Sequence, residues 1–122
     1  MDEIETKNAI ITSVRITTAD HGCLIAWVDL DYGGSCQGFG GRVLYLPDSF
    51  THSTNQANYA GHFIYRVIEI ADVYEWGSVP GKTVRVKANH SGVIEIGHIV
   101  KEDWFNPKID FDRMGALARN DN

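Results

Sequence analysis

The residues of this chain best suited to binding a small molecule lie in and beside a glycine-rich stretch, DYGGSCQGFGGR, at positions 31–42. The indole of Trp27 and the carboxylates of Asp29 and Asp31 precede the glycines, and the guanidinium group of Arg42 follows them. A strand glycine carries no side chain, so an aromatic ring or a planar ligand can approach the backbone closely. An indole flanked by guanidinium groups offers stacking to a base and charge-assisted hydrogen bonds to phosphates.

Two predicted hairpin loops decide which of these side chains share a face. Gly33 and Gly34 are typical of a two-residue loop of the primed type, which needs positive φ at its central residues. This loop predicts the pairs Asp31–Cys36, Asp29–Gly38, Trp27–Gly40 and Ile25–Arg42 on one face, with Leu30–Gln37, Val28–Phe39, Ala26–Gly41 and Leu24–Val43 on the other. A three-residue loop at Asp20-His21-Gly22 predicts Arg15–Trp27 and Ser13–Asp29 on the first face, with Val14–Val28 and Ile16–Ala26 on the second.

The second face is mainly apolar, so the first is expected to point away from the core. The candidate ligand-binding residues on this outer face are Arg15, Trp27, Asp29, Asp31, Gly38, Gly40 and Arg42. Gly41 is expected to point toward the core instead. An alternative interpretation involves no ligand: Trp27 covers the glycines and forms a cation–π pair with Arg15.

Other chemistries have weaker support in the sequence. The segment GGSCQGFGG lacks the Gly-Lys-Ser/Thr of a phosphate-binding Walker loop, and no zinc spacing or nucleophile motif occurs. No catalytic residue, metal or cofactor is therefore predicted. His98 is expected on a strand, where it would meet Glu102 or Asp103 after the chain turns. Cys23 and Cys36 are expected to be free thiols, because the predicted register separates them by about eight residues along one hairpin.

The predicted elements are five strands and one helix. Alternation and β-branched residues predict strands at 10–18, 23–31, 38–46, 83–89 and 93–100. A polar loop is expected at 47–58, and apolar residues at helical spacing predict a helix at about 58–73. The order β-β-β-α-β-β predicts an α+β domain: an antiparallel sheet of about five strands with one helix packed on one face. The C-terminal segment is expected to dock Trp104, Phe105 and Pro107.

Composition narrows the classes of function. The chain has 122 residues, 43% of them hydrophobic and 22% charged, which predicts a single globular domain with flexible ends at 1–8 and 115–122. Its net charge of −5 argues against nucleic-acid binding and against a polybasic membrane attachment. No apolar run is long enough to cross a membrane, and no signal peptide is recognisable, so a cytoplasmic location is expected.

Three segments together resemble a known group of proteins. TTADHGCLIAWVDLDYGGSCQGFGGRVL, VPGKTVRVKA and IGHIVKEDWFNP resemble a family of small, mostly uncharacterised proteins encoded by bacteriophages and prophages. The resemblance covers about residues 8–107 and departs at Cys36, where a small residue such as glycine is expected. It implies an accessory protein that acts in the cytoplasm of a bacterial host.

Three hypotheses on function follow. The first is a non-catalytic binding module, expected to be a homo-oligomer, that counters bacterial defence by sequestering a nucleotide-type small molecule on the Trp27 face. The second is a protein–protein inhibitor of a host defence complex, of anti-CRISPR type, that uses an acidic edge with Trp104 and Phe105. The third is a small nucleotide-processing enzyme that uses Asp29 or His98.

Overall fold

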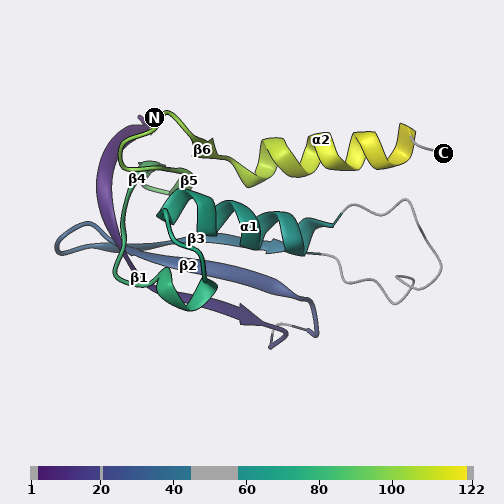
Figure 1. Ribbon diagram of the computed structural model, residues 1–122, viewed down its shortest axis with the longest axis horizontal. Helices are drawn as coiled ribbons and strands as arrows, with labels where there is room; N and C mark the ends of the chain where they lie inside the picture. The colour runs from purple at the N-terminus through teal and green to yellow at the C-terminus, as the bar shows by residue number, and fades with distance from the viewer. Residues whose placement is uncertain (1–2, 20, 45–57, 121–122) are drawn as a thin grey trace.

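A computed structural model describes residues 3–19, 21–44 and 58–120 of the chain. The loop expected at 47–58 lies outside these residues, apart from Asn58, and so does Asp20 of the first predicted turn. The elements are β1 (Glu5–Thr17), β2 (Ile25–Asp31), β3 (Cys36–Val43), α1 (Tyr59–Ala71), a 3₁₀ turn (Trp76–Ser78), β4 (Thr83–Asn89), β5 (Gly92–Gly97), β6 (Trp104–Phe105) and α2 (Pro107–Asn120). Figure 1 shows their arrangement.

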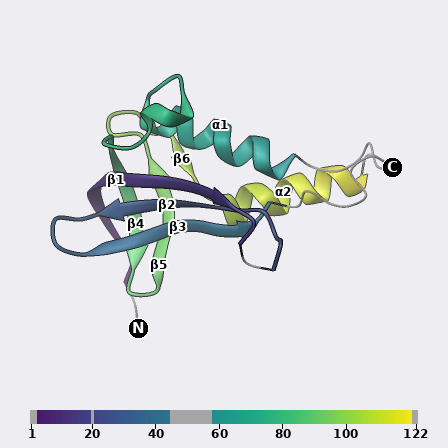
Figure 2. The ribbon, with the colours of Figure 1, turned by 90° about the horizontal axis from the view of Figure 1, so that it is seen from below.

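The strands form one antiparallel sheet in the order β3-β2-β1-β4-β5-β6. The long strand β1 joins its two halves, because its last part pairs with β2 and its first part pairs with β4. The sheet bends at this strand, so that β4 and β5 run across the direction of β2 and β3 (Figure 2). The bend brings β3 close to β5. Gln37 holds the two halves together, since its Nε2 donates to the Asn89 carbonyl at 3.0 Å.

Helix α1 packs on the inner face of the bent sheet and completes the core. Its N-terminus is capped by Asn58, whose Oδ1 accepts from the Gly61 N–H at 2.8 Å. Phe63 of α1 meets Phe39 of β3 and Phe105 of β6, with ring centroids 5.9 and 5.5 Å apart. All three rings are buried, and the buried residues around them come from every strand of the sheet.

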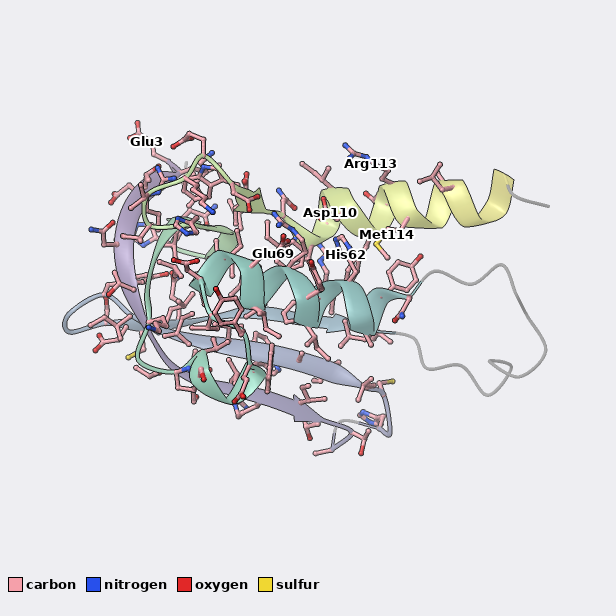
Figure 3. The ribbon with its side chains drawn as sticks, in the orientation of Figure 1. Glu3, His62, Glu69, Asp110, Arg113 and Met114 are labelled. Atoms are coloured by element: carbon pink, nitrogen blue, oxygen red, sulfur yellow. The ribbon has the colours of Figure 1, made fainter. Side chains whose placement is uncertain are left out.

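The second helix, α2, was not expected from the sequence. Asn106 caps its first turn, and Pro107 occupies the first helical position, where a missing N–H is tolerated. His62 of α1 and Asp110 of α2 point toward each other, with Nε2 and Oδ2 2.7 Å apart (Figure 3). The Phe111 ring packs edge-on against Tyr59, 4.8 Å between centroids. These contacts attach the start of α2 to α1, and the helix then extends away from the sheet (Figure 1).

The predicted α+β class is confirmed, with a sixth strand and a second helix added. Residues 5–8 and 115–120, expected to be flexible, lie in β1 and α2, and residues 5–8 pair with β4. Cys23 and Cys36 are free thiols, as predicted, and both are exposed. Within the described part of the chain, no helix has both the length and the apolar character needed to cross a membrane.

Candidate functional site

Trp27 lies on the outer face of the sheet, the face opposite α1, with its indole flat against β3. A Cβ atom on Gly38 would lie 2.9 Å from Trp27 Cε3, and a Cβ on Gly41 would lie 2.3 Å from Cζ2. These distances are shorter than real Cβ contacts, so only glycine leaves room for the ring at both positions. We call Gly38 and Gly41 the glycine bed of Trp27.

Because of a bulge in β3, Gly40 and Gly41 lie on the opposite faces from those predicted. The pair Trp27–Gly40 is confirmed, but Ile25 pairs with Val43, so the predicted pairs Ile25–Arg42 and Leu24–Val43 are wrong. The predicted pair Ala26–Gly41 lies at the bulge between these two pairs. Gly40 and Gly41 adopt φ angles of 108° and 74°. A Cβ on Gly40 would lie 3.1 Å from Cζ of the buried Phe63. Gly40 therefore faces the core and Gly41 faces Trp27, the reverse of what was expected.

Arg15 lies beside Trp27 but is bound to Asp29. Their strands pair Arg15 with Trp27 and Ser13 with Asp29, as predicted. Arg15 Nε and Nη2 donate to the Asp29 carboxylate at 3.1 and 3.2 Å, and the Ser13 hydroxyl donates to the same group. The hydrogen bond from Arg15 is the main reason why the pKa of the Asp29 carboxyl is lowered from its usual value. The alternative interpretation without a ligand is thus confirmed in one part, since Trp27 covers glycines of β3. Its other part is not, because among the described residues no cation lies over the Trp27 ring.

Asp31 and Arg42 have other surroundings. Asp31 Oδ1 accepts from the N–H groups of Gly33 and Gly34 at 2.8 and 3.3 Å, which stabilises the hairpin turn. Arg42 lines a separate pocket of about 270 Å³ together with Gly40 and Lys108. The structure thus brings Arg15, Trp27, Asp29 and Gly38 together, and gives Asp31, Gly40 and Arg42 different positions or roles.

A second indole on the outer face was only partly anticipated. Phe105 docks in the core as expected, but its neighbour Trp104 lies flat on Gly97, where a Cβ would approach the ring to 2.6 Å. Arg85 and Lys87 lie over the Trp104 ring at 4.8 and 4.3 Å from its centroid. The sequence signal that could have found this cluster is the glycine on β5, which marks a close approach just as it does on β3.

His98 organises the loop between β5 and β6. Its Nδ1 accepts from the N–H groups of Val100 and Lys101, both at 3.0 Å. Arg85 adds hydrogen bonds from its guanidinium to the carbonyls of His98 and Lys101 at 2.8 and 2.6 Å. The expected meeting of His98 with Asp103 occurs through the backbone, since the His98 N–H donates to the Asp103 carbonyl at 2.9 Å. The carboxylate that the His98 ring faces is Asp72, which the sequence analysis did not identify.

Comparison with protein-family models, curated proteins and solved structures finds no match to this chain.

Proposed function

We propose that the protein is a non-catalytic binding module that captures a nucleotide-type small molecule on the outer face of its sheet, with Trp27 as the stacking platform. The observation that supports this most directly is the position of the Trp27 indole. Its inner ring face rests on the glycine bed, so the ring is held flat along the sheet. A ring held in this way loses little freedom when a planar base stacks on its other face.

Arg15 supplies the polar part of the proposed site. A guanidinium group has five N–H donors, and the Asp29 carboxylate takes two of those of Arg15. The remaining donors include both on Nη1, and the carboxylate fixes the plane in which they lie. An arginine that is preorganised next to an aromatic ring suits the phosphate or the base edge of a nucleotide. We further propose, from the resemblance to phage proteins, that this capture counters a bacterial defence system.

Isothermal titration against a panel of cyclic and ADP-ribose-type nucleotides tests this proposal. Losing one stacked base should weaken binding about tenfold to a hundredfold in Trp27→Ala. Trp104→Ala is the matched control, because it removes the other indole that lies on a glycine. Circular dichroism of both variants checks that they remain folded. The proposal is refuted if no nucleotide of the panel gives heat, or if the two variants bind equally well.

A protein–protein inhibitor is the second candidate function, and α2 is the feature that favours it. Ile109 and Leu117 are apolar residues of this helix that are 52% and 57% exposed. The surface first expected for such an inhibitor is less suitable, because Phe105 is buried and Arg85 and Lys87 cover Trp104. Pull-down from a bacterial lysate with Leu117→Lys as the comparison would identify a stoichiometric protein partner of this helix.

A further inference from the structure

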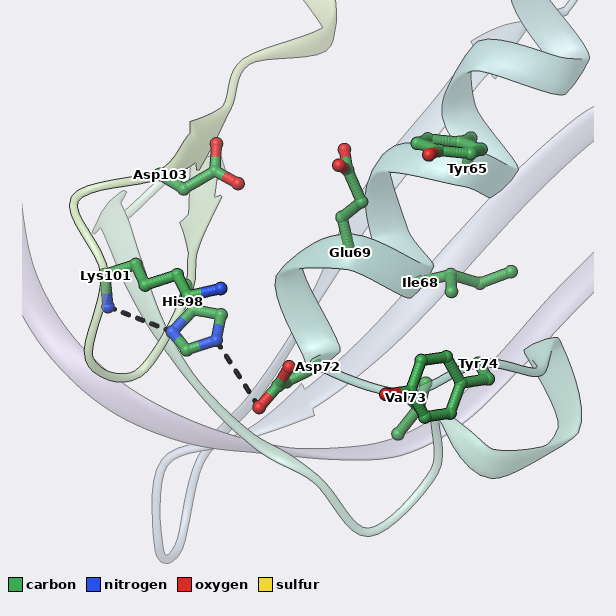
Figure 4. Close-up of a pocket in the computed structure, with 9 residues that line it drawn as sticks. All are labelled: Tyr65, Ile68, Glu69, Asp72, Val73, Tyr74, His98, Lys101 and Asp103. Carbon is green, nitrogen blue, oxygen red and sulfur yellow. Dashed lines mark hydrogen bonds and ion pairs between the residues drawn. The ribbon is translucent and has the colours of Figure 1, made fainter.

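A pocket of about 360 Å³ at the C-terminal end of α1 carries groups that the proposed function does not use. One wall is formed by the last turn of α1, its C-cap Asp72 and the residues that follow. The other wall is the β5–β6 loop, which contributes His98, Lys101 and Asp103 (Figure 4). Since α1 covers the inner face of the sheet, this pocket is separate from the Trp27 platform.

The charge of the pocket is predominantly negative. Three carboxylates line it, those of Glu69, Asp72 and Asp103, whereas Lys101 is the single cation among the described lining residues. The end of α1 adds to the negative potential, because helix C-termini carry partial negative charge and this helix has no basic residue in its last turn. A cation placed in the pocket would therefore lie in a favourable electrostatic potential.

Arg66 neutralises only part of the negative charge of these carboxylates. Its Nη2 donates to Asp103 Oδ1 at 2.7 Å, and its Nη1 donates to Glu69 Oε1 at 2.5 Å. Among the described residues, no hydrogen bond is donated to Glu69 Oε2 or to the Asp72 carboxylate, so both have unused lone pairs. The side chains of Glu69 and Asp72 are 42% and 72% exposed, and both line the pocket, Glu69 from the last turn of α1 and Asp72 from its C-cap.

The buried side chain of His98 points its Nε2 atom at the Asp72 carboxylate. His98 is only 5% exposed, and within the described chain its Nε2 has no hydrogen-bond partner. Because Nδ1 accepts two backbone N–H groups, the proton of the neutral ring is on Nε2. This N–H faces Asp72 Oδ2 at 3.6 Å, too long for a hydrogen bond. A small shift of Asp72 toward the ring would satisfy the donor and fix the carboxylate at the pocket.

The remaining lining is aromatic and apolar. Tyr65 is 66% exposed and Tyr74 is fully exposed, and both rings border the pocket together with Ile68 and Val73. Tyrosine rings attract cations that lie over their faces. Aliphatic side chains in turn suit the methylene groups of an alkyl chain.

We propose that this pocket binds an organic cation, an alkylammonium or guanidinium group held by Asp72 and Glu69 beside the rings of Tyr65 and Tyr74. The cation is either a free small amine or a Lys or Arg side chain of a partner protein, since both present the same chemistry. The proposal does not depend on nucleotide binding at Trp27.

Calorimetric titration of the full chain with agmatine, which carries both cationic groups, is the first test. We expect saturable binding with a Kd of about 1 mM or tighter. Neutral n-butylurea should give none. The acetylated and amidated peptide Gly-Arg-Gly identifies the source: binding of agmatine alone indicates a free amine, and binding of the peptide as tightly as agmatine indicates a partner side chain.

Three variants locate the site. Asp72→Asn should weaken agmatine binding about tenfold, because it removes the charge while asparagine still tolerates the left-handed C-cap at φ 60°. Asp112→Asn on α2 is the matched control, since its side chain is also 72% exposed, and it should bind like the unaltered protein. Lys101→Gln should bind agmatine more tightly, because it removes a competing cation from the pocket.

The proposal is overturned if neither agmatine nor the peptide binds saturably up to about 10 mM. It is also overturned if Asp72→Asn and Asp112→Asn behave alike, or if Lys101→Gln weakens agmatine binding, because Lys101 would then not compete with a bound cation. Amide chemical shifts provide the second readout: agmatine should move the resonances of residues 72 and 98–101, and shifts confined to other regions would contradict the assignment.

Discussion

Replacing either glycine under the Trp27 ring by alanine should lower the free energy of unfolding. The loss should be larger at Gly41 than at Gly38. In Gly38→Ala the new Cβ would lie 2.9 Å from the indole, with the backbone otherwise permissive. In Gly41→Ala the Cβ would lie 2.3 Å from the ring, and the residue would also have to adopt a φ of 74°. Both substitutions force the ring away from β3.

The two costs follow from separate physical terms. Alanine in place of a strand glycine gains about 0.5–1 kcal/mol in chain entropy, whereas overpacking against a seated ring costs about 1–3 kcal/mol. Gly38→Ala should therefore lose about 1 kcal/mol of unfolding free energy. At Gly41 the left-handed backbone costs a further 1–2 kcal/mol or so and the overlap with the ring is larger, which gives a loss of about 2–4 kcal/mol after the same entropy gain is subtracted.

Two other glycines separate these terms in the same urea-unfolding assay. Gly33 has a φ of 85° with nothing within 4 Å of its Cβ position, so Gly33→Ala measures the backbone cost alone, about 1–2 kcal/mol. Gly77 has open space and no positive φ, so Gly77→Ala should change stability by less than about 0.5 kcal/mol. Near-ultraviolet circular dichroism should report a moved indole in Gly38→Ala and Gly41→Ala only. If Gly41→Ala costs no more than Gly33→Ala, the indole does not rest on β3 and the platform at Trp27 is wrong.

Three further predictions concern other features. Because the pKa of Asp29 is lowered, its pairing with Arg15 stabilises the fold at pH values above the unfolded-state pKa of about 3.9, and this contribution is lost as the pH falls through the folded-state pKa. The unfolding free energy of Arg15→Met, measured in urea, should therefore fall less between about pH 5 and pH 2 than that of the unaltered protein. An equal fall in both proteins would contradict the pairing. His98→Ala removes the acceptor of two loop N–H groups and a buried ring, and should lower the unfolding free energy by about 2–4 kcal/mol, measured by urea unfolding. Cys23 and Cys36 are exposed, so both thiols should react with Ellman's reagent in the native protein, and a thiol that reacts only after denaturation would contradict its placement.

Hairpin chemistry was sufficient to predict most of the register on the outer face. Gly33 and Gly34 adopt positive φ, and a two-residue loop there leaves one way to pair Asp29 with β3. The strong alternation of β2, in which Ala26, Val28 and Leu30 are buried, excludes a slip by one residue. For these strands local turn geometry and the apolar pattern agree, and the pairing of β1 with β2 followed for the same reason.

The bulge at Gly40 and Gly41 could not be predicted by this reasoning. Two adjacent glycines permit positive φ without requiring it, and Arg42 and Val43 are both exposed, so no inward–outward alternation fixes the register across these two residues. In the folded protein Gly40 is enclosed by two elements: a Cβ there would lie 2.5 Å from the Ala26 carbonyl oxygen of β2 and 3.1 Å from Phe63 of α1. Neither contact can be read from the order of residues within β3.

The omission of α2 has a different physical origin. Asn106 and Pro107 are the expected signals of a helix start, and they were present in the sequence. The helix that follows has polar and apolar residues in about equal number, and its Phe111 is buried against Tyr59 and His62 of α1. Its stability therefore depends on a partner element about fifty residues away in the chain, which a periodicity argument does not include.

The two indoles of the outer face differ in one respect that bears on function. Trp27 and Trp104 both lie on glycines of neighbouring strands, and both have an arginine close by. At Trp104 the cations of Arg85 and Lys87 lie over the ring, which is the arrangement that a purely structural tryptophan would adopt. At Trp27 the arginine is turned aside and held by Asp29, so in the described structure the outer ring face has no cation over it. The same architecture thus provides a covered indole and an uncovered one, and the uncovered ring is the one suited to stacking a ligand.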